Sequence, residues 1–280
     1  MMQAQVLTAV VKEMKIVRTI NYGQKYITDL KYVNKGKVCV SVVNKLHEKP
    51  FLYHRGDSIS CFSTYGSCLC FTWREYPEDI IYIFSDNRSL ILYDKLRNKK
   101  RIWPQSGELS TEYTPSGIAA CKSQAILVCL WNHQVHERSL GKVLKLSIWG
   151  EKFFEIETDK NRPLFICPTY ITENGNEDIC VSDVNAVVVT DAGGFLRFRY
   201  RGTQSDPQFD PYGICCDSKN NIIVADTVKN RIHMIDQNGG LLHYINYSDM
   251  HMPRALCIDE GDNLYVGEWL SEEIKVLSLQ

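Results

Sequence analysis

The feature that most limits the fold of this chain is a repeating unit of four short apolar runs. Its clearest copy spans residues 212–246 and reads YGICCD, NIIVAD, RIHMID and LLHYIN, with the polar turns SKN, TVKN and QNGG between the runs. Apolar runs of this length bounded by turn residues are typical of antiparallel strands. Asn238-Gly239 is typical of a tight hairpin. The unit is therefore predicted to be a four-stranded meander without helices.

Similar units recur along the chain, and a proline opens each of the last four. Pro115, Pro163, Pro211 and Pro253 follow one another at intervals of 42 to 48 residues, and two looser units precede them. A period of about 40 to 50 residues with four strands per unit predicts a β-propeller. The last unit stops after three runs, but KIVRTINYG at residues 15–23 resembles the missing fourth run. The expected fold class is all-β, a six-bladed β-propeller in which both termini close one blade.

Residues 1–280 are expected to form this single domain. Two alternatives concern the N-terminus. The run QVLTAVV at residues 5–11 competes with EEIKVLSL for the third position in the last blade, and residues 1–14 are alternatively a remnant of a longer parent chain. No apolar run approaches the roughly 20 residues that span a bilayer, so no membrane partner is expected.

Charge and cysteine usage exclude several functional classes. The formal net charge is −1, so only a local patch would attract nucleic acid or anionic lipid. The 11 cysteines are odd in number and many lie in apolar runs, which favours reduced thiols and a cytoplasmic location over a disulfide framework. No cysteine pair has ordinary zinc spacing. We therefore expect no metal and no other cofactor.

The clearest unit resembles an NHL repeat, whose usual form contains P-x-G-I, N-I-x-V-A-D, N-R-I and D-x-x-G. The matching residues are Pro211, Gly213, Ile214, Asp217, Asn221, Ile222, Val224, Ala225, Asp226, Asn230, Arg231, Ile232, Asp236 and Gly239. The C-terminal unit matches in part, with Glu268 in place of the aspartate and Glu273 in place of the arginine. The other units keep only the apolar pattern.

The resemblance extends to the NHL propellers at the C-terminus of tripartite-motif proteins, especially divergent invertebrate ones. It implies a non-catalytic module that recognises a substrate or partner for a ubiquitin ligase. Ligase activity would need a RING domain, and oligomers would form only through a coiled coil, both upstream of this segment in such proteins. The expected partner is a protein, with RNA as the alternative.

Asp226 and Arg231 end one strand and begin the next, so a short turn should pair them. Arginine stays protonated in proteins and is a poor proton carrier, which favours a structural role for the pair over catalysis. Pro211 and Gly213 are expected to be structural as well. His233 lies inside a predicted strand and reads as a packing histidine.

The predicted partner-binding surface gathers residues from strand starts and from the hairpins between the second and third strands. These residues are Tyr212, Arg254, Trp269, Trp131, His133 and Lys229. Aromatic residues and arginine are the common hot spots of interfaces. Alternatively, Trp131 and Trp269 cap the core at the ends of their strands.

An enzyme ranks last among the three functions considered. Metal-dependent hydrolases and lyases on propellers need several inward acidic, amide or histidine side chains. The predicted inner strands offer mainly apolar and thiol groups instead. His133, His136 and Glu137 lack the spacing of helical zinc signatures. No catalytic residue is therefore predicted.

Overall fold

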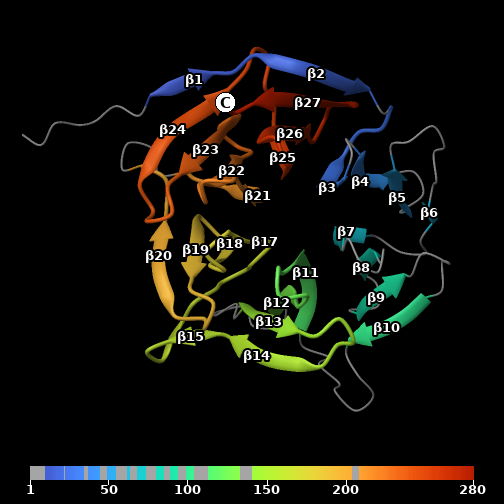
Figure 1. Cartoon of the computed structure of the whole chain (residues 1–280), viewed down its shortest axis with the longest axis vertical. Coiled ribbons are helices and arrows are strands. Elements are labelled where there is room, and N and C mark those ends of the chain that lie inside the picture. Colours follow the sequence, from blue (N-terminus) through green and yellow to red (C-terminus); the bar gives the residue numbers. More distant parts are fainter. Residues whose placement is uncertain are drawn as a thin grey trace, which may run out of the picture.

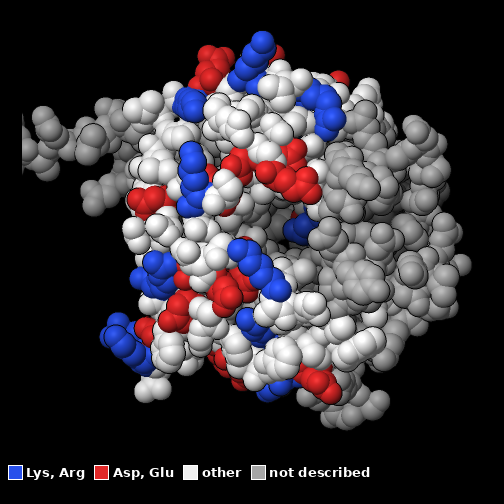
Figure 2. Space-filling view, viewed as in Figure 1, with Lys and Arg blue, Asp and Glu red and all other residues white. Residues whose placement is uncertain are grey.

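The computed structural model describes residues 10–21, 23–34, 37–44, 49–54, 62–63, 68–73, 80–84, 89–93, 99–103, 113–132, 141–203 and 208–280. The described residues form strands and turns without helices. Their antiparallel sheets stand side by side in a ring (Figure 1), and the described face is hollowed at its centre (Figure 2). The predicted all-β propeller arrangement is confirmed.

Each sheet runs outward from an inner strand in chain order, except where the chain closes. The sheets are β3(Ile27–Asn34)–β4(Lys37–Asn44)–β5(Lys49–His54)–β6(Phe62–Ser63), β7(Cys68–Trp73)–β8(Ile80–Phe84)–β9(Ser89–Tyr93)–β10(Lys99–Trp103), β11(Tyr113–Ala120)–β12(Ile126–Asn132)–β13(Gly141–Leu146)–β14(Lys152–Ile156), β17(Tyr170–Glu173)–β18(Ile179–Asp183)–β19(Ala186–Thr190)–β20(Leu196–Tyr200), β21(Pro211–Cys216)–β22(Ile222–Asp226)–β23(Arg231–Ile235)–β24(Leu241–Asn246) and β25(Pro253–Ile258)–β26(Asn263–Glu268)–β27(Glu273–Ser278)–β2(Ile16–Asn21). The clearest sequence unit is thus the sheet β21–β24.

The N-terminal segment completes the last sheet. β2 pairs antiparallel with β27, with Ile20 opposite Ile274, so the predicted origin of the fourth strand is confirmed. The segment before it adds something that the sequence pattern did not predict. β1 (Val11–Glu13) pairs parallel with β24, as a fifth strand on the neighbouring sheet. The alternative third strand of the last sheet was the run at residues 5–11, of which the structure describes residues 10 and 11. These two residues do not fill that position, because β27 pairs with β26 there.

The strand predicted to begin at Pro163 begins later. Pro163 lies instead in the small antiparallel pair β15 (Thr158–Asp159) and β16 (Arg162–Pro163), and the inner strand β17 starts at Tyr170. A side chain holds part of the intervening loop, because the carboxylate of Asp183 accepts the backbone N–H groups of Ile166 at 2.8 Å and Cys167 at 2.6 Å. The regular proline interval therefore fails in this unit.

The core lies between neighbouring sheets. Every residue of β18, β19 and β22 is buried. When a sheet is covered on both faces, its strands have continuous apolar sequences. Apolar and polar residues alternate only in strands with one exposed face. Val224 packs in one cluster with Val128 and Val189, and Ile223 packs in another with Val266. Each middle strand thus joins two layers of core.

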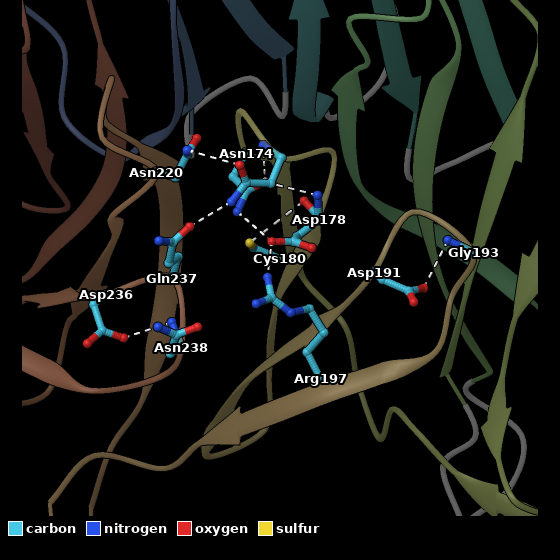
Figure 3. Close-up of polar contacts among 11 residues, drawn as sticks. Asn174, Asp178, Cys180, Asp191, Gly193, Arg197, Asn220, Asp236, Gln237 and Asn238 are labelled. Atoms are coloured by element: carbon cyan, nitrogen blue, oxygen red, sulfur yellow. Dashed lines mark hydrogen bonds and ion pairs between the residues drawn. The ribbon is translucent and has the colours of Figure 1, made fainter.

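Side-chain oxygens close the hairpin turns at the ends of the first and third strands. Oδ1 of Asp236 accepts the backbone N–H groups two and four residues later, at 2.7 and 2.9 Å, and Asp217 does the same at 2.9 and 2.8 Å. Aspartate commonly stabilises turns in this way. Neighbouring turns also bond to each other, as where Asn220 donates to Asn176 at 3.2 Å and Asn176 donates to Gln237 at 2.7 Å (Figure 3).

Candidate functional site

The opposite ends of the sheets carry the candidate site, where inner strands begin and where the second strand turns into the third. Asp183, Asp226 and Glu268 end the second strands of three successive sheets. Each is almost fully buried and accepts a backbone N–H from the loop that enters its own sheet. The repeated acid therefore fixes the loops on which the site is built.

Hydroxyl groups tie the starts of successive inner strands together. Ser116 donates to the carbonyl oxygen of Pro168 at 2.5 Å, Ser182 to that of Tyr212 at 2.6 Å, and Thr227 to that of Pro253 at 2.7 Å. These contacts join one sheet to the next around the ring. They hold the strand starts at fixed positions, which a precise site requires.

Gly213 is needed for the close packing of two inner strands. A Cβ at this position would lie 2.4 Å from the carbonyl oxygen of Arg254, closer than any real contact. Pro211 is buried at the start of the same strand. Their placement brings β21 and β25 together directly below the site.

Arg254, Tyr212 and Trp269 form one cluster, which we call the Arg254 cluster. The Cζ atom of Arg254 lies over both rings, 4.3 Å from the ring centroid of Tyr212 and 4.4 Å from that of Trp269. Two further rings extend it. Tyr170 packs edge-on against Tyr212 at 6.2 Å, and Tyr26 against Trp269 at 5.2 Å. The predicted convergence of the first three residues is present in the structure.

Tyr170 also reaches a distant sheet. Its hydroxyl donates to the backbone oxygen of Thr28 at 2.6 Å, and Thr28 belongs to the sheet β3–β6. The aromatic row therefore links strand starts from several sheets and connects sequence positions more than a hundred residues apart.

Asp210 is an acid at this face that the sequence analysis did not select. It lies directly before Pro211 and is half-buried. Burial raises the pKa of its carboxyl above the usual value, the nearby charge of Asp226 raises it further, and the charge of Arg254 lowers it. The carboxyl is thus close enough to both groups for their charges to act on it. Alignment of the repeats would have placed Asp210 beside this face.

Behind Asp210 lies a buried polar network. Arg231 Nη2 is 3.6 Å from Oδ2 of Asp226, so the predicted ion pair is present. His233 adds a contact that the sequence did not suggest, with Nε2 at 3.2 Å from the same oxygen and Nδ1 at 2.8 Å from the hydroxyl of Tyr200. The side chains of Asp226 and His233 are both 0% exposed.

The other predicted site residues lie outside the Arg254 cluster or outside the described residues. Trp131 is the next-to-last residue of β12, and Lys229 lies in the turn between β22 and β23; both are half-buried. His133 lies outside the described residues, as do His136 and Glu137. Within the described part of the chain, no group of three or more histidine, cysteine and acidic side chains could hold a metal ion. The expected lack of a metal or cofactor stays a prediction.

Two general surface properties bear on partners. Basic and acidic side chains intermingle on the face shown in Figure 2, and no broad basic patch covers its described residues. No helix among the described residues is long and apolar enough to cross a membrane.

No protein-family model matches the chain, and no curated protein matches it. Solved structures do. The chain is similar to a putative gluconolactonase, with a TM-score of 0.70 and 14% identity over 95% of this chain and 91% of that one. It is similar to the calcium-binding protein regucalcin from Agrobacterium tumefaciens, with a TM-score of 0.70 and 11% identity over 97% of each chain. It is also similar to a catalytically inactive virginiamycin B lyase from Staphylococcus aureus with quinupristin, with a TM-score of 0.64 and 15% identity over 96% and 89%.

These neighbours support the propeller fold and correct the functional prediction. Lyases and a putative gluconolactonase stand among them, which contradicts both the expected non-catalytic module and the expectation of no enzyme. The sequence analysis had considered acidic groups on the inner strands alone. In this structure Asp210 and Asp183 lie in a loop and at the end of a second strand. Membership of the tripartite-motif NHL proteins is not shown.

Proposed function

We propose that this chain is a lyase or hydrolase that acts on a small molecule bound over the Arg254 cluster. Asp210 is the proposed proton-transfer group, and Arg254 stabilises negative charge. The observation that carries the proposal is a half-buried carboxyl of raised pKa on the same face as an arginine held between aromatic residues. The enzymatic propellers among the neighbours support it.

Both reaction classes need the same two contributions. A base removes a proton, from carbon in an elimination or from the attacking water in a hydrolysis, and returns it to the leaving group or releases it to solvent. Negative charge then develops on oxygen, and a fixed cationic donor stabilises it. Burial brings the pKa of Asp210 closer to neutral pH, which makes the carboxylate a stronger base than an exposed aspartate.

The test is turnover by the purified chain on quinupristin, gluconolactone and a panel of simple esters. Asp210→Asn should abolish turnover. Arg254→Gln should reduce it by about 10² or more, as the loss of one charge-stabilising donor does elsewhere. Glu155→Gln, at a surface acid paired with Lys152, is the matched control and should change nothing. In the wild type, activity should rise with pH through the raised pKa of Asp210.

Absence of any Asp210-dependent turnover across this panel would refute the proposal. So would an Asp210→Asn variant that keeps wild-type rates.

The complete ring is proposed to have six blades, built on NHL-like repeats. The four-stranded sheets given above and the closure by β2 support this count. A crystal structure of the whole chain would test it directly, and a seventh sheet or an open ring would refute it.

A cytoplasmic location is likewise proposed. Free thiols support it: Cys121, Cys129, Cys167, Cys180, Cys215, Cys216 and Cys257 are unpaired among the described residues. Thiol counting on protein isolated from its native cell under alkylating conditions tests it. The expected protein and RNA partners stay predictions, to be tested by recovery from cytosol with and without RNase.

A further inference from the structure

Arg254 forms no ion pair with an acidic side chain in the part of the chain that the structure describes. Among the described residues its guanidinium makes no hydrogen bond and no ion pair, and its Nε atom is shielded from solvent without an acceptor. Arginine cannot lose its proton in proteins, so the charge stays at this position. Buried polar groups normally have partners, and one that lacks a partner calls for an explanation.

The two aromatic contacts leave the donors of this guanidinium for another group. Its Cζ atom lies over the rings of Tyr212 and Trp269, so the rings occupy its π surface. The N–H bonds point outward in the plane of the guanidinium, in a fork that matches a carboxylate. Stacking also fixes the side chain, so little rotamer freedom is lost when a ligand binds.

The side chains on the face around Arg254 favour a ligand that is apolar apart from its charged group. Val228 is 58% exposed and Leu270 is 44% exposed. Leu270 directly follows Trp269, and Val228 directly follows Thr227, whose hydroxyl bonds to the residue before Arg254. The face that carries this charge therefore also carries half-buried aromatic and exposed aliphatic side chains.

Asp210 restricts the charge of the ligand. Its carboxyl is near enough to interact electrostatically with Arg254. A doubly charged phosphate would be repelled by this acid, whereas a single carboxylate would leave the local charge nearly balanced. A carboxylate also needs only one guanidinium for two parallel hydrogen bonds.

We propose that the Arg254 cluster binds the carboxylate of an apolar organic acid, and that the substrate of this chain carries such a group. The second part rests on the proposed enzymatic function. The first part is a binding property and stands without turnover.

The experiment measures dissociation constants by ligand-observed NMR for 4-phenylbutyrate, its uncharged amide and inorganic phosphate. Wild-type protein should bind the acid at least tenfold more tightly than the amide, and more tightly than phosphate. Arg254→Gln should weaken binding of the acid at least tenfold and leave binding of the amide unchanged. Arg254→Lys should fall between, because it keeps the charge and loses the fork.

Arg18→Gln is the matched control. Arg18 also lies over a ring, 5.8 Å from the centroid of Tyr265, but belongs to β2 in the outer part of its sheet. Its replacement should not change binding of the acid. Thermal unfolding verifies that each variant folds. If Arg254→Gln does not fold, Trp269→Ala provides a second test of the cluster.

Equal affinity for the acid and the amide, or no binding of the acid to wild type, would overturn the proposal. Tighter binding of phosphate would overturn the choice of carboxylate. The two proposals fail separately: turnover of neutral substrates without carboxylate binding removes this inference alone, and carboxylate binding without turnover removes only the enzymatic function.

Discussion

Replacement of Asp226 by alanine should destabilise the whole domain. The side chain is 0% exposed, and one of its oxygens lies 3.6 Å from Arg231 and 3.2 Å from His233. Alanine would remove the buried carboxylate that both His233 and Arg231 contact. The backbone N–H of Asp210, 3.4 Å from the other oxygen, would lose its acceptor as well.

The magnitude follows from how buried each partner is. Removing one member of a buried ion pair costs about 3 to 5 kcal/mol. Arg231 keeps 20% of its side chain exposed, and its Cζ atom lies 4.1 Å from the ring centroid of Tyr244, so solvent and the ring compensate part of the lost charge. We therefore expect the lower end, about 3 kcal/mol, which lowers the unfolding midpoint of a domain of this size by roughly 6 °C.

Thermal and urea unfolding followed by circular dichroism give this difference. Glu155→Ala is the control, because its contacts with Lys152 at 3.3 Å and Lys142 at 3.6 Å are at the surface. Such pairs contribute less than about 1 kcal/mol. An Asp226→Ala midpoint within about 1 °C of wild type would refute the structural role assigned to the network.

Four further changes test the fold and its electrostatics. Deletion of residues 1–23 removes β2 and exposes the edge of β27, so urea unfolding should shift to lower concentration; a wild-type midpoint would exclude closure by the N-terminus. Gly213→Ala places a Cβ 2.4 Å from a carbonyl oxygen and should lower the thermal midpoint more than Gly261→Ala at an exposed turn, and equal effects would contradict the packing argument. Burial alone would raise the pKa of Asp259, but hydrogen bonds within its turn bring it below the usual value. Its contribution is therefore complete above the unfolded pKa of about 4 and is lost as pH falls through the folded pKa, so Asp259→Asn should lose less stability than wild type between about pH 5 and pH 2. Burial, followed by a nearby acid, raises the pKa of Cys121 to about 12, so mass spectrometry should show slow alkylation at pH 8 until urea unfolds the chain.

The repeat made most of the sheet pattern predictable. Turn residues such as Asn238 and Gly239 are local signals, and the position of Arg254 beside Tyr212 followed from equivalent places in successive units. Contacts that cross the ring could not be predicted in this way. The bond from Tyr170 to Thr28 and the parallel strand β1 depend on how the sheets assemble, which no local pattern encodes.

The functional error has the same physical origin. The inner strands do carry apolar and thiol groups, as in Ile214 and Cys215. The acid at the candidate site, Asp210, lies in a connecting loop, where the local pattern assigns no direction to a side chain. Its proximity to Arg254 becomes visible only once two neighbouring sheets are placed side by side.

The two N-terminal strands have a consequence for biosynthesis. β1 pairs with β24 and β2 with β27, so a segment made first finds its partners more than 200 residues later. At about 5 to 20 residues per second, the ribosome leaves these strands without partners for roughly 10 to 50 seconds. The nascent chain must therefore stay able to fold during this time, and the last sheet of the ring can close only after β27 has been synthesised.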